Sequence, residues 1–137
     1  MTRIVAGSAK GRTLAVPKSG TRPTSERVRE ALFSRLDHMN VLDGATVLDL
    51  YAGTGALGLE ALSRGGAHAT LVEKASAAAR VASANVRSTG LPARVVTADA
   101  RTYLGARSGE ELAGDIDLVF IDPPYDIAED DMTTVLS

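Results

Sequence analysis

Four short apolar runs, each ending on or beside an acidic residue, are the feature of the chain that most limits how it can fold. They span Thr46–Tyr51, Ala69–Glu73, Arg94–Asp99 and Asp117–Asp122 and are rich in Val, Leu and Ile. Apolar runs of this length are typical of strands buried on both faces of a sheet. Helix-like segments separate them, which predicts right-handed crossovers and a mostly parallel sheet with helices on both faces. The pattern therefore predicts an α/β fold.

Two of the connecting segments read as helices. Ala56–Arg64 ends before a glycine pair, and Ser76–Ser88 ends two residues before another glycine, which commonly stops a helix at this position. The third connection, Arg101–Gly114, is interrupted by two further glycines and does not read clearly as a helix.

The first third of the chain has a different pattern. Ile4–Ala6 and Thr13–Val16 are short strand-like runs around a turn with two glycines, which predicts a hairpin. A helix is expected to begin near Thr24, whose hydroxyl can cap free backbone N–H groups. Helical spacing predicts a buried stripe on this helix, with its arginines exposed, formed by Val28, Leu32, Leu36 and Met39.

The composition excludes several kinds of functional site. The 137 residues suffice for one domain with a real core, and none of them is cysteine. Disulfides, zinc–thiolate sites, iron–sulfur clusters and a thiolate nucleophile are therefore excluded. The two histidines, His38 and His68, show no metal-ligand spacing, so no metal is expected. Neither a membrane span nor a secretory signal is expected, because no run approaches 18 apolar residues and the N-terminus has no apolar stretch behind its charges. A cytoplasmic location is expected.

Charge is distributed unevenly along the chain. Residues 1–35 carry eight basic and two acidic side chains, a net charge of +6, whereas the remainder carries seven basic and fifteen acidic ones, a net charge of −8. A basic segment on an acidic body is a plausible footprint for a polyanion. A merely solvated hairpin and helix face would give the same pattern.

Acidic residues at the strand ends predict where a ligand binds. In an open parallel sheet, ligands bind beyond the carboxyl ends of the strands, near the point where the strand order reverses. Asp49, Glu73, Asp99 and Asp122 would gather at this edge and form an anionic rim.

A glycine-rich segment belongs to the same edge. Residues 53–58 match G-x-G-x-x-G, and Glu73 follows Gly55 by 18 residues, so a dinucleotide site and an oxidoreductase have to be considered. The helix N-terminus would favour a pyrophosphate, but Asp49 beside it would repel one. S-adenosylmethionine carries a sulfonium, an ammonium and no phosphate, and it suits an acid-lined pocket better. The dinucleotide oxidoreductase remains an alternative.

Each position at this edge has an expected role toward S-adenosylmethionine. The glycines let the backbone turn tightly and approach the cofactor. Asp49 would face the methionine end, Glu73 would accept both ribose hydroxyls, and Asp99 with the backbone of Ala100 would read the adenine. The predicted cofactor-binding residues are Asp49, Tyr51, Gly53, Gly55, Glu73, Lys74, Asp99 and Ala100.

The segment Asp122-Pro123-Pro124-Tyr125 follows the last apolar run and is suited to hold a planar exocyclic amine. The Asp122 carboxylate and the Pro123 carbonyl can accept N–H bonds, the two prolines stiffen the backbone, and Tyr125 can stack on a base. These four residues are the predicted catalytic set for methyl transfer to the amino group of a nucleobase.

With these motifs, the chain resembles the bacterial RsmD-type methyltransferases, which modify guanine N2 in small-subunit ribosomal RNA. The resemblance covers essentially the whole chain. It is found in the basic hairpin (Arg3, Lys10, Gly11, Arg12), in residues 21–24 together with Arg27 and Arg29, and in residues 47–58, 72–74 and 120–125. It implies a class I methyltransferase that uses S-adenosylmethionine in rRNA processing. The implied partner is 16S rRNA or the small ribosomal subunit, with no membrane, and a monomer is expected.

The resemblance also implies an architecture. A hairpin extension (residues 1–20) would precede a Rossmann-like methyltransferase domain (residues 21–137) whose relatives have seven strands. Because the chain ends at Ser137, soon after the fourth central strand, it is expected to be a portion of a longer protein.

Basic side chains near the N-terminus are expected to hold RNA phosphates. They are Arg3, Lys10, Arg12, Arg22, Arg27 and Arg29. Arg22 could instead face the methyl-transfer site. Two further alternatives stay open: a DNA adenine-N6 methyltransferase, and a non-catalytic nucleotide-binding or RNA-binding module of the same fold.

Overall fold

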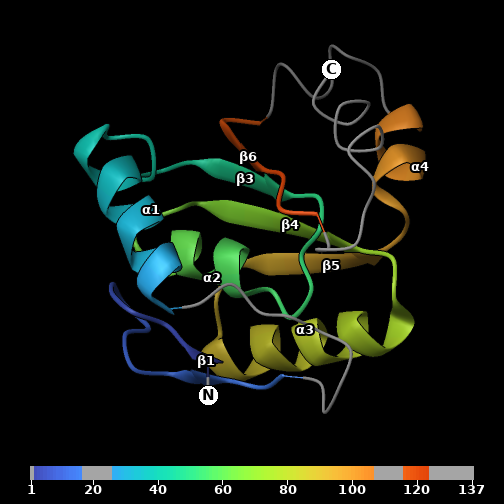
Figure 1. The fold of residues 1–137 in the computed structure, drawn as a ribbon, viewed down its shortest axis with the longest axis horizontal. Coiled ribbons are helices and arrows are strands. Elements are labelled where there is room, and N and C mark those ends of the chain that lie inside the picture. The colour runs from blue at the N-terminus through green and yellow to red at the C-terminus, as the bar shows by residue number, and fades with distance from the viewer. Residues whose placement is uncertain (1, 17–25, 107–115, 124–137) are drawn as a thin grey trace.

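The four predicted apolar runs form one parallel sheet. The computed structural model describes residues 2–16, 26–106 and 116–123. The strands of the sheet are β3 (Thr46–Asp49), β4 (His68–Glu73), β5 (Ala93–Thr97) and β6 (Leu118–Phe120), in the order β5-β4-β3-β6. All three pairings are parallel (Figure 1), which confirms the predicted α/β arrangement.

Successive residues of each strand pack on opposite faces of the sheet and build two apolar clusters. Val47 and Leu71 belong to the larger cluster, whereas their neighbours Leu48 and Val72 belong to the smaller one. Both faces are buried, which explains why these strands read as apolar runs without alternation.

Helices cover both faces of the sheet (Figure 1). α2 (Ala56–Ser63) and α3 (Ser76–Thr89) pack on the face of the larger cluster. α4 (Ala100–Gly105) contributes Ala100 and Tyr103 to the smaller cluster on the opposite face. α2 and α3 match the two predicted helices to within one residue at each end, and α4 begins the connection that had no clear pattern. None of the described helices combines the length and apolar character needed to cross a bilayer.

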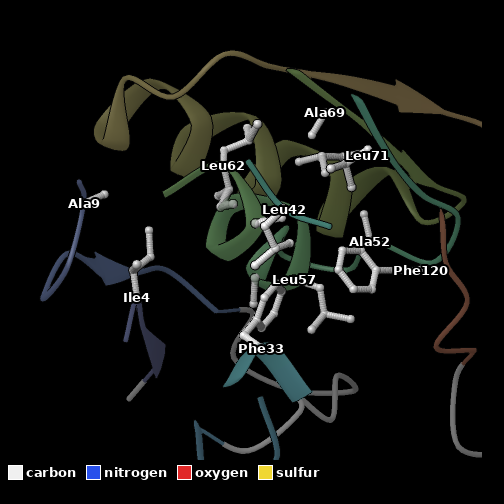
Figure 2. Close-up of a cluster of buried hydrophobic side chains, with 14 of the residues drawn as sticks. Ile4, Ala9, Phe33, Leu42, Ala52, Leu57, Leu62, Ala69, Leu71 and Phe120 are labelled. Carbon is white, nitrogen blue, oxygen red and sulfur yellow. The ribbon is translucent and has the colours of Figure 1, made fainter. Parts of the chain in front are cut away.

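The N-terminal segment forms the predicted hairpin. β1 (Thr2–Arg3) pairs antiparallel with β2 (Thr13–Leu14), so the first strand lies just before the predicted Ile4–Ala6 run. Ile4 and Leu14 are fully buried in the same cluster as Phe33 and Leu62. Figure 2 shows Ile4 together with Phe33 and Leu62. The hairpin therefore shares the core of the sheet. The predicted boundary at residue 20 lies outside the described residues.

The buried stripe of α1 (Glu26–His38) differs from the prediction. Val28 and Met39 are 57% and 63% exposed, whereas the fully buried side chains are Arg29 and Phe33. Leu32 and Leu36 are partly buried, as expected. An arginine can occupy this core position because an acidic partner from another element neutralises it, as described below. Thr24, the predicted cap, lies outside the described residues.

Candidate active site

The carboxyl ends of β3 and β6 lie side by side. Asp49 and Phe120 are register partners, and the Leu50 N–H donates to the Phe120 carbonyl at 3.1 Å. β4 lies on the other side of β3, so the strand order reverses between β3 and β6, where open α/β sheets bind ligands. The ends of β3 and β6 therefore converge as predicted, and the charge of Asp122 acts on Asp49. Pro124 and Tyr125 lie outside the described residues.

Asp49 is a buried carboxyl at this point. Its side chain is fully buried, and within the described residues neither of its oxygens has a hydrogen bond of normal geometry. Burial raises the pKa of Asp49 to about 7; the charges of Asp122 and Glu73 act in the same direction, and the nearby backbone N–H groups of Tyr51 and Gly58 oppose it. The N–H groups are close enough to favour the charged form but do not meet hydrogen-bond geometry, so burial dominates. A positively charged ligand would stabilise this carboxylate.

The glycine-rich loop leaves open space at Gly53. Gly53 has a φ of +55°, and a Cβ at this position would have no atom of the described chain within 4 Å. Its N–H donates to Glu73 Oε1 at 2.8 Å, which ties the loop to the end of β4. Gly55 has a φ of +90°, but a Cβ there would meet Leu71 Cδ1 at 3.1 Å. Gly53 therefore fits the predicted close approach to a ligand, whereas Gly55 lets α2 begin tightly against β4.

Glu73 and Asp99 bind backbone groups. Glu73 accepts hydrogen bonds from the N–H groups of Gly53 and Ala75, each at 2.8 Å. Asp99 caps α4 and accepts from the Arg101 N–H at 2.9 Å. Each carboxylate oxygen has two lone pairs, so these bonds orient the side chains and leave acceptor capacity for a ligand.

The other predicted site residues lie at the same edge. Lys74 and Asp122 are exposed, Tyr51 and Pro123 are half-buried, and Ala100 is buried. Each follows the end of a strand by three residues or fewer. The parallel sheet thus collects at one edge all predicted cofactor and catalytic residues that the structure describes.

The predicted RNA-binding residues differ in how far they are exposed. Those on the surface are Arg3, Lys10, Arg12 and Arg27. The prediction for Arg29 was wrong. Its side chain is fully buried, pairs with Glu60 at 3.5 Å and donates to the Arg3 carbonyl. It therefore cannot reach an RNA phosphate. Arg22 lies outside the described residues.

Sequence reasoning missed the polar residues of α2 that hold the hairpin. The buried Glu60 carboxylate accepts from the N–H groups of Val5 at 2.9 Å and Ala6 at 3.1 Å. The Ser63 hydroxyl accepts from the Ala9 N–H at 2.9 Å and donates to the Ala6 carbonyl at 2.6 Å. The hairpin is therefore fixed on α2 by hydrogen bonds as well as by its apolar side chains.

Asn85 of α3 makes a third attachment. Its buried side chain accepts from the Ala15 N–H at 2.8 Å and donates to the Ala15 carbonyl at 3.1 Å. It also donates to the Thr54 carbonyl in the glycine-rich loop at 2.9 Å. One side chain thus links the hairpin to the candidate site. The available signal for Glu60 was a single charged residue inside an apolar helix, whereas Asn85 lies among other polar residues of α3 and had no such signal.

Comparisons with known proteins agree with this arrangement. A family model described as Conserved hypothetical protein 95 matches residues 2–137. The chain is 43% identical over 125 residues to the Ribosomal RNA small subunit methyltransferase D of Escherichia coli K12, covering 90% of this chain and 60% of that protein. It is 39% identical over 126 residues to the Putative rRNA methyltransferase YlbH of Bacillus subtilis 168, covering 90% and 66%.

A solved structure of a hypothetical protein from Thermus thermophilus has the same fold. It superposes with a TM-score of 0.84 at 38% identity and covers 99% of this chain and 77% of its own. These matches confirm the resemblance to RsmD-type methyltransferases. The chain spans about 60% of the length of the E. coli relative.

Proposed function

The chain belongs to the family described as Conserved hypothetical protein 95, and we propose that it methylates the exocyclic N2 amine of a guanine in small-subunit ribosomal RNA, with S-adenosylmethionine as the methyl donor. The observation that carries the proposal is the adjacent placement of β3 and β6. It brings Asp49 and the Gly53 loop to the same edge as Asp122 and Pro123. The relatives named as rRNA methyltransferases support the substrate class.

The residues at this edge suit S-adenosylmethionine. The buried Asp49 carboxyl has no hydrogen-bond partner in the described part of the chain and would gain a cationic one. Gly53 leaves space for the ligand, and Glu73 retains acceptor capacity for ribose hydroxyls. A pyrophosphate at the start of α2 would not supply the cationic partner that Asp49 lacks, which disfavours a dinucleotide.

The chain's own residues would orient the acceptor amine. When bound, S-adenosylmethionine supplies a methyl group on a positively charged sulfur. The Asp122 carboxylate and the Pro123 carbonyl would accept the N–H bonds of the guanine amine and aim the nitrogen lone pair toward the Asp49 side of the site. The Asp122 carboxylate would also be placed to take the proton that the nitrogen loses on methylation. Orientation of this kind can supply about 7–11 kcal/mol of the barrier. Stacking by Tyr125 stays a prediction.

A mapped methylation assay tests this function. Purified protein is incubated with labelled S-adenosylmethionine and either undermodified small ribosomal subunits or duplex DNA, and the labelled nucleotide is identified. The expected result is label on N2 of one guanine. Label on adenine in duplex DNA, with none on rRNA, would assign the protein to DNA adenine-N6 methylation. Binding of S-adenosylmethionine without transfer to any nucleic acid would indicate a non-catalytic module.

A further inference from the structure

Residues 74–98 form a basic stretch within the acidic part of the chain. They include Lys74, Arg80, Arg87 and Arg94 and no acidic residue, although residues 36–137 have a net charge of −8. All four basic side chains are exposed. Four exposed cations with no acidic residue between Glu73 and Asp99 create a local positive potential, which attracts a polyanion.

Two of these cations form a stripe on the outer face of α3. The inner face of the helix buries three alanines and Asn85. Arg80 and Arg87 are seven residues apart, which places them on the same side of the helix and about 10 Å apart along its axis. Both lie on the exposed side, away from the sheet.

The carboxyl end of α3 meets the hairpin (Figure 1). Arg12 Nη1 donates to the Ser88 carbonyl at 3.4 Å, and Asn85 bonds both backbone groups of Ala15. Arg12 therefore lies beside the residue that follows Arg87. The exposed cations of the hairpin and the stripe of α3 join into one basic surface.

The amino end of α3 reaches the edge that carries the candidate active site. A hollow of about 400 Å³ opens here, lined by Ser76, Ala79, Arg80, Ser83 and Thr97. Three hydroxyls and a guanidinium are donors that suit a phosphate group. The carboxylates of Glu73 and Asp99 follow just beyond, where a phosphate would be repelled and where the cofactor is proposed to bind.

We propose that the outer face of α3, from Arg87 to the hollow at Arg80, is a second phosphate-binding surface for the RNA substrate. The distance from residue 88 to residue 76 is about 18 Å along the helix. A strand of RNA lying on this face would run from the hairpin to the catalytic edge. The proposal depends on rRNA being the substrate, and it adds two residues to the RNA contacts.

Neutralising the stripe tests the proposal. Arg80→Gln/Arg87→Gln is compared with wild type for affinity to an unmethylated 16S rRNA transcript between about 50 and 200 mM salt. The plot of log affinity against log salt should become shallower by about 1.4–1.8, because each lost phosphate contact contributes roughly 0.7–0.9. With undermodified subunits, KM should rise while kcat, S-adenosylmethionine affinity and Tm stay unchanged. Arg35→Gln, on the exposed face of α1, is the matched control.

The possible outcomes test the α3 surface and the proposed function separately. Wild-type protein that fails to bind or methylate rRNA would overturn the function, and this surface with it. Wild-type binding with an unchanged salt slope in Arg80→Gln/Arg87→Gln would overturn the α3 surface alone. An equal loss for each removed charge in Arg35→Gln would show a general charge effect and would also overturn it. A loss with subunits but not with the protein-free transcript would assign the face to a ribosomal protein instead.

Discussion

The burial of Asp49 in the candidate site lowers the stability of the folded protein. A buried carboxyl without a hydrogen bond is uncommon, because burial of an unpaired polar group is unfavourable. Here the carboxyl lies where the strand order reverses, next to the charges of Asp122 and Glu73. An unfavourable burial of this kind is expected where a cationic ligand completes the site. Its effect on the free energy of unfolding can be measured on the protein without any ligand.

Replacing Asp49 by Asn should stabilise the protein above pH 7 and have little effect near pH 4. The pKa of Asp49 is raised from 3.8 to about 7 in the fold, so the folded state binds the proton more tightly than the unfolded state. The stability that this proton contributes is fully present below about pH 4 and is lost as the pH rises towards 7. A shift of this size corresponds to at most roughly 4 kcal/mol. Urea unfolding of both proteins from about pH 4.5 to 8.5, a range that spans the titration, measures the difference.

Asp43→Asn, the same change at an exposed acid before β3, controls for the loss of one charge. A stability difference between wild type and Asp49→Asn that did not vary with pH would contradict the raised pKa.

Asp122 is expected to act on the acceptor and not on the cofactor. Asp122→Ala should lower kcat by about 100-fold or more, a loss typical when a preorganised polar group is removed from a catalytic site. Its affinity for S-adenosylmethionine should remain largely unchanged, since the cofactor groups follow β3, β4 and β5. Single-turnover methylation and calorimetric binding measure the two effects, with Asp43→Ala as the control. Wild-type turnover in Asp122→Ala would remove Asp122 from the mechanism.

At the scale of elements, two glycines in the hairpin turn have similar backbone angles but different surroundings, so their alanine variants can be compared. Gly7 and Gly11 both have left-handed backbone, with φ of +90° and +86°. A Cβ on Gly7 would lie 1.8 Å from the Ser63 carbonyl oxygen, whereas a Cβ on Gly11 would meet no atom of the described chain within 4 Å. Alanine at either position is strained by about 1–2 kcal/mol. Only Gly7→Ala must also move the hairpin away from α2.

Gly7→Ala should therefore lose more stability than Gly11→Ala and should release the hairpin. The hydrogen bond from the Ser8 N–H to the Ser63 carbonyl, at 2.7 Å, would break together with the bond from the Ala9 N–H to the Ser63 hydroxyl. Amide hydrogen exchange at Ser8 and Ala9 should accelerate in Gly7→Ala alone. Similar exchange in both variants would mean that the close approach to α2 does not hold the hairpin.

The strands were predictable from the sequence, whereas the buried face of α1 was not. Strands buried on both faces read as continuous apolar runs, and the parallel order then brings their acidic ends together. On α1, periodicity counts apolar side chains only and so selected Val28 and Met39. The actual buried face contains Arg29, which is neutralised by Glu60 from α2, and no local pattern in α1 reports a partner on a distant element.

The candidate site was predictable to a similar degree. Its residues could be named because they follow the strand ends. The unpartnered state of Asp49 within the described chain and the bonds of Glu73 to Gly53 and Ala75 depend on the path of the loop backbone, which residue types do not specify.

At the scale of the whole molecule, the hairpin is both a basic surface and a part of the core. Its exposed cations face solvent, while Ile4 and Leu14 are buried with the helices that cover the sheet. Asn85 further connects Ala15 of the hairpin to Thr54 of the glycine-rich loop. RNA bound on the hairpin would therefore contact a surface that is rigidly connected to the edge that carries the candidate active site.

Two variants should separate these roles. Arg3→Gln/Lys10→Gln/Arg12→Gln should keep a nearly unchanged Tm, because all three side chains are exposed. Its rRNA affinity should show a salt slope shallower by about 2–3, at roughly 0.7–0.9 for each phosphate contact. Deletion of residues 2–16 should instead destabilise the whole fold. Loss of the buried Ile4 and Leu14 side chains removes about 3–6 kcal/mol, at roughly 1.5–3 kcal/mol each.

That loss is a large share of the roughly 5–15 kcal/mol by which domains are usually stable, and the deletion also leaves Glu60 without the N–H groups of Val5 and Ala6. Thermal unfolding and the salt dependence of rRNA binding, measured on both variants, distinguish the two effects. A deletion variant with wild-type Tm would show that the hairpin is an appendage, and the rigid connection between RNA surface and catalytic edge would then be wrong. A deletion that unfolds, beside a neutralised hairpin that stays folded and binds RNA weakly, would mean that this protein cannot lose its RNA-binding extension without losing its fold.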